Sequence, residues 1–159
     1  MGSLKKIQTA KKYGIANAGR AFLAARKVGL PYFVAVALLE KESGGRNVWG
    51  NDTGGMLAGF HRPVNEWTYK AFRHEVKRGR TSNGVGPCQI TWPGFFDQME
   101  KRGLKPWVAM DNMIFGFELL KSYHDASGSW IDAGERYNGA RAYGVDLDAR
   151  ITRWRARIL

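Results

Sequence analysis

An apolar run over residues 31–39 leads into residues 40–45, whose sequence is Glu-Lys-Glu-Ser-Gly-Gly. Proline at the first turn and glycines after the last one are typical of a helix, which we expect over residues 31–43. Glu42 then lies in the last turn, where apolar surroundings partly desolvate its carboxyl group. Desolvation disfavours the charged form, so we expect the pKa of Glu42 to rise toward values suited to proton donation near neutral pH. Glu42 is therefore the leading candidate for a general acid, and Glu40 is the competing choice.

The remaining pattern is also mainly helical. Residues 3–28 contain no proline, and apolar residues recur there at spacings of three and four, which predicts one helix. Asp111 is a suitable N-cap for the apolar positions that follow it. Residues 44–63 are rich in glycine and lack periodicity, which indicates a long loop or a small irregular β element. Further helices are expected over residues 65–77, 93–102, 111–126, 130–137 and 145–159.

Chain length and composition favour one domain. The 159 residues are 44% hydrophobic, which is enough for a single sizeable core, so we expect one domain over residues 1–159, with residues 1–3 a possible cloning remnant. No stretch approaches the roughly 20 apolar residues that span a bilayer, and the polar N-terminus lacks the apolar block of a secretory signal. We expect no membrane contact and no export signal in this sequence.

The strong positive charge predicts an anionic partner. With 25 Lys and Arg against 14 Asp and Glu, the formal net charge is +11, and Glu40 is the first acidic residue in the chain. Nucleic acid, a membrane surface and an anionic glycan all fit such a charge, and a merely solvated helix face is a further explanation. A non-catalytic binding module for nucleic acid or cell wall would use Lys and Arg of residues 5–27 and 150–157, although no zinc-finger or RNP-like motif is present.

The chain has few residues of the types that bind metals or carry out redox chemistry. Cys88 is the single cysteine, so neither an intramolecular disulfide nor a thiolate cluster can form. His61, His74 and His124 are scattered without the spacing of metal ligands. We expect no metal and no cofactor.

Three clusters combine turn residues with polar or aromatic side chains. In the cluster at residues 84–92, Gln89 offers an amide and Trp92 offers a stacking face, two groups that suit an N-acetylated sugar. Each cluster alone also has a structural explanation, as a helix-end carboxylate, a turn residue or a helix C-cap. The clusters are residues 42–45, residues 84–92 and residues 136–140.

Taken in order, these clusters resemble the goose-type lysozyme and soluble lytic transglycosylase family. That family is marked by a Glu-Ser pair at a helix end, a Gly-x-x-Gln-(Ile or Leu) turn, and a Tyr-Asn turn before a closing helix. Residues 84–92 are also similar to a stretch of phage endolysin modules from phages that infect actinobacteria. The resemblance implies a mainly α, single-domain lysozyme-like fold. The matching residues are Glu42-Ser43, Gly86-Pro87-Cys88-Gln89-Ile90 and Tyr137-Asn138.

The resemblance implies that Glu42 protonates the MurNAc-β-1,4-GlcNAc bond of peptidoglycan. Asp52 would be a second catalytic carboxylate that holds a water for hydrolysis, or else a residue that caps its own loop. Without a second carboxylate, the muramoyl C6 hydroxyl attacks and a 1,6-anhydro product forms, so a lysozyme-type hydrolase and a lytic transglycosylase both remain open. The expected substrate-binding residues are Ser43, Gln89, Ile90, Trp92, Tyr137 and Asn138.

The same resemblance implies a role in bacterial cell-wall lysis. We expect the partners to be peptidoglycan glycan strands and anionic cell-wall polymers, bound by a monomer without nucleic acid or membrane. As a phage lysin, the protein would be made in the host cytoplasm and would act on the wall after release, with the help of a holin.

Overall fold

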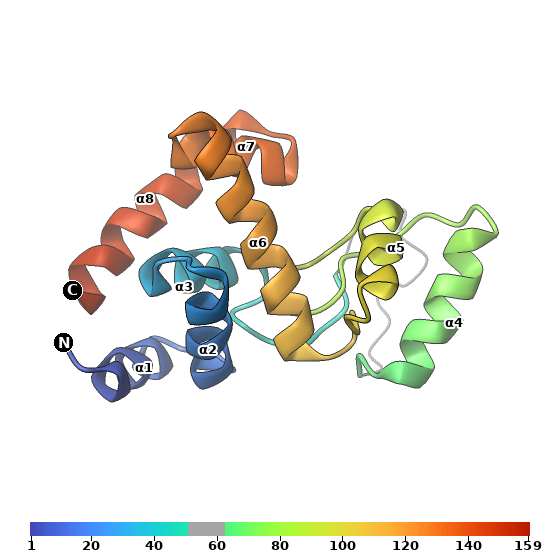
Figure 1. Cartoon of the computed structure of the whole chain (residues 1–159), viewed down its shortest axis with the longest axis horizontal. Coiled ribbons are helices and arrows are strands. Elements are labelled where there is room, and N and C mark those ends of the chain that lie inside the picture. The colour runs from blue at the N-terminus through green and yellow to red at the C-terminus, as the bar shows by residue number, and fades with distance from the viewer. Residues whose placement is uncertain (51–62) are drawn as a thin grey trace.

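The computed structural model describes residues 1–50 and 63–159, and this part of the chain is mainly helical (Figure 1). Within it, the only β structure is two isolated antiparallel bridges, Trp49 with Val85 and Val85 with Ile90. The predicted mainly α class is therefore confirmed. The helices are α1 (Ser3–Lys12), α2 (Ala18–Val28), α3 (Tyr32–Glu42), α4 (Glu66–Lys77), α5 (Pro93–Lys101), α6 (Ala109–Ser127), α7 (Trp130–Asn138) and α8 (Arg141–Ile158).

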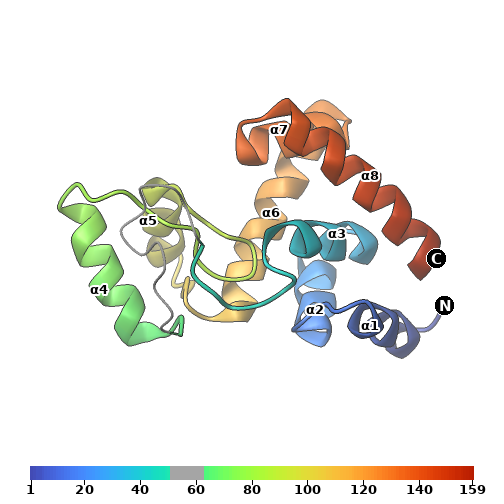
Figure 2. The same cartoon turned by 180° about the vertical axis from the view of Figure 1, so that it is seen from behind.

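Helix α3 is the buried helix of the core. Every residue from Val34 to Leu39 is fully buried, which explains why this segment is apolar on all sides instead of amphipathic. It packs against α2 and α8 (Figures 1 and 2). It ends at Glu42, with Ser43 as its C-cap, so Glu42 lies in the last turn, as predicted.

The single helix predicted over residues 3–28 is wrong, because the chain breaks between α1 and α2. Gly14 and Asn17 adopt left-handed backbone conformations, with φ of 86° and 54°. The break lies against the glycines that follow α3, where the amide of Ala16 donates to Gly44 O at 2.8 Å. A Cβ on Gly45 would lie 2.1 Å from Ala16 O, so only glycine permits this close approach.

Two helix starts differ by two or more residues from the sequence prediction. Helix α6 begins at Ala109, with Val108 as its N-cap, so the predicted N-cap role of Asp111 is wrong; Asp111 lies in the first turn and accepts from the amide of Lys105. Helix α8 begins at Arg141, four residues before the predicted start. The second difference places Tyr143 in the first turn of α8.

The elements separate toward two ends of the molecule. Helices α1 and α2, the C-terminal end of α8 and both termini lie at one end, whereas α4 and α5 lie at the other (Figures 1 and 2). Helix α6 runs between these ends and packs against α2 and α7. Among the described residues, no helix is long and apolar enough to cross a membrane.

Candidate active site

A cavity of about 560 Å³ opens beside the end of α3, a size typical of small-molecule sites. The residues around it come from α3, from the segment between α4 and α5, from the start of α5, and from α6 and α7, so elements distant in sequence meet here. Six of the residues expected from the sequence line it together: Glu42, Gln89, Ile90, Trp92, Tyr137 and Asn138.

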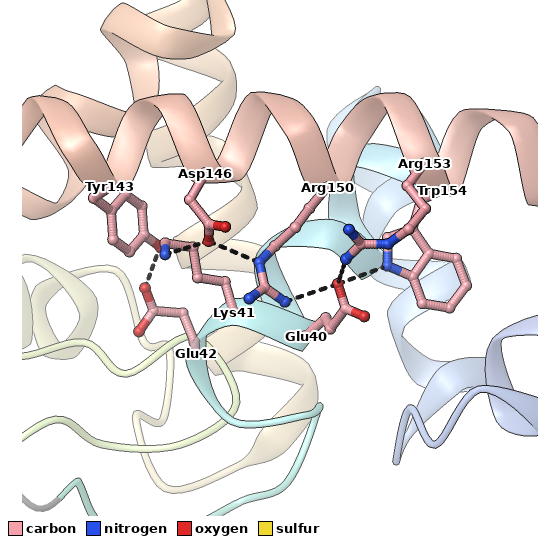
Figure 3. A network of polar contacts seen from close by, with 8 residues as sticks. All are labelled: Glu40, Lys41, Glu42, Tyr143, Asp146, Arg150, Arg153 and Trp154. Atoms are coloured by element: carbon pink, nitrogen blue, oxygen red, sulfur yellow. Dashed lines mark hydrogen bonds and ion pairs between the residues drawn. The ribbon is translucent and has the colours of Figure 1, made fainter.

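Glu42 is held by a tyrosine that the sequence analysis did not single out. The hydroxyl of Tyr143, in the first turn of α8, donates a hydrogen bond to Oε1 of Glu42 (Figure 3). Burial raises the pKa of Tyr143, and the adjacent charge of Glu42 raises it further, so the phenol keeps its proton and remains a donor. The contact fixes one oxygen of the carboxyl group at the edge of the cavity.

The turn of residues 84–92 forms one wall of the cavity. Val85 and Ile90 pair through two backbone hydrogen bonds, of 2.9 and 3.1 Å. Gln89 has φ of 51°, and its side-chain amide donates to Val48 O at 3.1 Å and Gly86 O at 3.0 Å. The amide nitrogen of Gln89 is therefore used to hold the turn, while the side chain still lines the cavity.

Three helices hold this turn through its own backbone. Ser43 Oγ, at the end of α3, donates to Pro87 O at 2.7 Å, and Tyr137 Oη, on α7, donates to Cys88 O at 2.7 Å. Asn112, fully buried on α6, accepts from Cys88 N at 2.9 Å and donates to Val85 O at 2.9 Å. The three sequence clusters are thus joined by hydrogen bonds around a single turn.

These contacts separate the roles of the predicted binding residues. Ser43 is buried, does not line the cavity, and uses its hydroxyl on Pro87 and on the amide of Gly45, so it positions the turn instead of facing a ligand. Tyr137 both lines the cavity and holds the turn. Asn138 is exposed at the end of α7 and leaves an amide at the cavity rim.

The aromatic residues differ in their access to the cavity. Trp92 is 58% exposed, lines the cavity and packs edge-on against Phe95 with ring centroids 4.9 Å apart. Trp49 is buried against Phe72, and Trp67 is exposed on α4, outside the cavity lining. Trp92 is therefore the tryptophan placed to stack on a ligand. Asp52, the predicted second carboxylate, lies outside the described residues.

Glu40, the competing candidate for the acid, is occupied elsewhere. Its Oε2 accepts from Arg153 at 2.9 Å, Arg150 at 3.0 Å and the indole N–H of Trp154 at 3.1 Å (Figure 3). Burial alone would raise the pKa of Glu40, but the hydrogen bonds from Trp154 and Arg150 and the arginine charges outweigh it and lower that pKa. Glu40 is an anchor for α8 and does not line the cavity.

A lysine and an aspartate lie behind the Glu42–Tyr143 contact. Lys41 Nζ is 4.4 Å from the centroid of the Tyr143 ring and forms an ion pair with Asp146 Oδ2 at 2.6 Å. Asp146 also accepts from Arg150 at 2.8 Å, and Arg150 bridges to Glu40. Figure 3 shows the ion pairs from Lys41 through Asp146 and Arg150 to Glu40, beside the Glu42–Tyr143 hydrogen bond. The Lys41 ammonium over the Tyr143 ring connects the two sets of contacts.

Burial keeps the other groups around Glu42 neutral. Burial, and then the nearby charge of Glu42, raises the pKa of the Cys88 thiol. Burial raises the pKa of Tyr137 as well, and Glu42 is among the charges that add to this effect. Among the described residues that line the cavity, Glu42 is the only one with a carboxyl group. In this part of the chain, no group of three or more His, Cys, Asp and Glu side chains could hold a metal ion.

Tyr143, Asn112 and the Lys41–Asp146 pair were not expected from the sequence. Tyr143 had a detectable signal, because Gly139 ends α7 as a left-handed C-cap and the next helix can start directly after it. Asn112 stands among apolar residues of α6 and had no signal beyond being polar in an apolar stretch.

Comparison of the chain with protein-family models, curated proteins and solved structures gave no match.

Proposed function

We propose that this protein is a peptidoglycan-degrading glycosidase that cleaves the MurNAc-β-1,4-GlcNAc bond, with Glu42 as the general acid. The observation that carries the proposal is the position of Glu42 at the edge of a cavity that also presents Gln89, Trp92 and Asn138. A carboxyl group, an exposed indole and amide groups are the side chains that a site for an N-acetylated glycan requires.

Tyr143 gives the carboxyl group a defined geometry for this reaction. With Oε1 accepting from Tyr143, the proton for the glycosidic oxygen is carried on Oε2. Transfer of that proton breaks the bond between the anomeric carbon and the departing oxygen, while the sugar ring takes on oxocarbenium character. Tyr143 then donates to the Glu42 carboxylate that remains, so the same contact serves both protonation states.

The second step returns the proton to Glu42. An oxygen nucleophile attacks the anomeric carbon, and Glu42 accepts its proton as general base. A water gives a reducing MurNAc end, as in a lysozyme, whereas the C6 hydroxyl of the same muramoyl residue gives a 1,6-anhydro end, as in a lytic transglycosylase.

Mass spectrometry of digested peptidoglycan tests the proposal and separates these products, because the two muramoyl ends differ by one water. Release of either product supports glycan cleavage. Fragments produced only by cleavage within peptide stems, or the absence of any release, would contradict it. The Asp52→Asn variant extends the test: a large loss of rate together with reducing ends indicates a water-positioning role, and an unchanged rate indicates a loop cap.

A further inference from the structure

The net charge of this protein is concentrated in its two terminal segments. Residues 40–150 contain 15 Lys and Arg against 14 Asp and Glu and are therefore almost neutral. Residues 1–39 and 151–159 together contain ten Lys and Arg and no Asp or Glu. The segment that contains the candidate active site thus contributes almost nothing to the charge of +11.

The fold brings the two basic segments together. Helix α1 packs against α2 and α8, and both termini lie at the same end of the molecule (Figures 1 and 2). Tyr13 after α1 packs edge-on against Trp154 of α8, with ring centroids 5.7 Å apart. We call this region the basic end; its cationic residues are Lys5, Lys6, Lys11, Lys12, Arg20, Arg26, Lys27, Arg153, Arg155 and Arg157.

All but one of the ten cations of the basic end lack a described acidic partner. Arg153 pairs with Glu40, and the other nine form no ion pair with any described Asp or Glu side chain. Eight of the ten are exposed; Lys6 and Arg157 are partly buried. Of the 14 described cations outside the basic end, nine, among them Arg73 and Arg102, pair with carboxylates. Unpaired cations that lie close together repel one another, and an anionic partner would relieve this repulsion.

The basic end is separate from the cavity. No residue of α1 or α2 lines the cavity beside Glu42. Tyr143 and Arg157 lie on the same helix, 14 residues apart, which corresponds to about 21 Å along the helix axis. A ligand at the basic end therefore does not need to occupy the cavity.

The exposed cations of the basic end come from three helices, which suits an extended polymer better than a single small anion.

The aromatic rings of the basic end are not arranged as a platform on which nucleic-acid bases could stack. Arg157 lies 3.9 Å from the centroid of the Tyr13 ring, and Arg155 lies 5.8 Å from that of Phe33. Proteins that bind single-stranded nucleic acid stack bases on open aromatic faces, so this arrangement favours a polyanion without bases.

We propose that the basic end binds a linear phosphodiester polymer of the bacterial cell wall, at a surface independent of the Glu42 cavity. The choice of the wall as the source rests on the proposed function; the preference for an extended phosphate polymer rests on the charge distribution. The polymer would hold the enzyme on its insoluble substrate while the cavity cleaves glycan strands.

The test uses the Glu42→Gln protein, so that binding is measured without cleavage. Purified cell walls are compared before and after hydrofluoric acid removes the polymers linked through phosphodiesters. We expect removal to weaken binding at least tenfold. Equal binding to both preparations would overturn the proposal.

Two matched triple variants in this Glu42→Gln protein locate the surface. Lys5→Gln, Lys12→Gln and Lys27→Gln remove three exposed cations of the basic end, whereas Lys77→Gln, Lys101→Gln and Lys105→Gln remove three exposed cations outside it. We expect the first set to reduce the slope of log K against log salt by about two, at about 0.7 for each lost phosphate contact, and the second to leave it unchanged. Equal effects of the two sets would contradict a defined surface.

A DNA duplex serves as the competing probe. Tighter binding of DNA than of the purified wall polymer, at equal phosphate concentration and equal salt, would assign the basic end to nucleic acid and overturn the proposal. Wild-type cleavage of soluble glycan fragments, which needs no anchoring to the wall, is measured separately. Absence of cleavage there contradicts the proposed function but not the binding surface, so the two failures are distinguishable.

Discussion

The hydroxyl of Tyr143 donates a hydrogen bond to Oε1 of Glu42, which lies 101 residues earlier in the chain. The contact joins the end of α3 to the start of α8, two helices that also pack along the core. Tyr143 helps to hold the Glu42 carboxyl group in one orientation at the edge of the cavity.

The Tyr143→Phe variant tests this role. Hydrogen bonds to charged groups contribute about 1.5–3 kcal/mol, so we expect kcat for glycan cleavage to fall by about 10-fold to 100-fold. KM should change little, because the phenol contacts the acid and not the cavity. Steady-state kinetics on soluble glycan fragments give both values. A Tyr143→Phe protein with wild-type kcat would show that Glu42 is oriented by other groups.

Lys41 is expected to act through Tyr143. Its ammonium group lies over the phenol ring and is itself held by Asp146, so Lys41→Met should reduce kcat by a smaller factor than Tyr143→Phe. A double-mutant cycle measures the coupling between Lys41 and Tyr143. Once Tyr143 is Phe, adding Lys41→Met should have less effect than in the wild type. Independent, multiplicative effects would mean that Lys41 acts elsewhere.

The turn that forms the cavity wall depends on Asn112. Asn112→Ala leaves the buried Cys88 amide without its partner and removes the side-chain donor to Val85 O and Pro106 O, so we expect the free energy of unfolding to fall by about 2–4 kcal/mol. Ser43→Ala removes one hydroxyl contact at the same turn and should cost about 1 kcal/mol. Denaturant titration measures both. Equal losses in the two variants would contradict the central position of Asn112.

Stability should fall at alkaline pH. Burial raises the pKa of Tyr32, Tyr69, Tyr137 and Tyr143 in the folded protein. Below about pH 9 these phenols are neutral in both states, and above about pH 10 they ionise only in the unfolded chain, which favours unfolding. Each contributes up to about 1.4 kcal/mol for each pH unit. Thermal unfolding from pH 8 to 11 should show a falling Tm, with a shallower fall in Tyr143→Phe. A constant Tm would contradict the neutral buried phenols.

Local sequence rules predicted the elements with strong local signals. The apolar run over residues 31–39 with the glycines that follow Ser43, and the glycine after Asn138, each specify a helix end through residues close to that end. The break between α1 and α2 was missed because it depends on contact between Ala16 and Gly44, which are distant in sequence.

In the candidate site, too, local signals were recognised from the sequence, whereas contacts between residues distant in sequence were not. The residues that line the cavity carry motifs that could be recognised one at a time, and six of them do meet there. The groups behind them, Asn112 and Tyr143, belong to helices whose packing brings them to the turn and to Glu42. No spacing along the chain predicts a contact made by tertiary packing.

Glu42 is the residue on which the proposed glycan cleavage depends, and Glu40 is its matched control. Both are glutamates at the end of α3, but Glu42 lines the cavity while Glu40 pairs with Arg150 and Arg153. Glu40→Gln should retain most of the activity and lower the free energy of unfolding by about 1–2 kcal/mol.

The decisive measurement is the rate of muropeptide release from purified peptidoglycan by wild type, Glu40→Gln and Glu42→Gln, with circular dichroism to confirm folding. We predict release by the wild type and by Glu40→Gln, and at least a 1,000-fold lower rate in folded Glu42→Gln, on the scale of general acid catalysis. A folded Glu42→Gln protein that releases muropeptides at the wild-type rate would contradict the assignment.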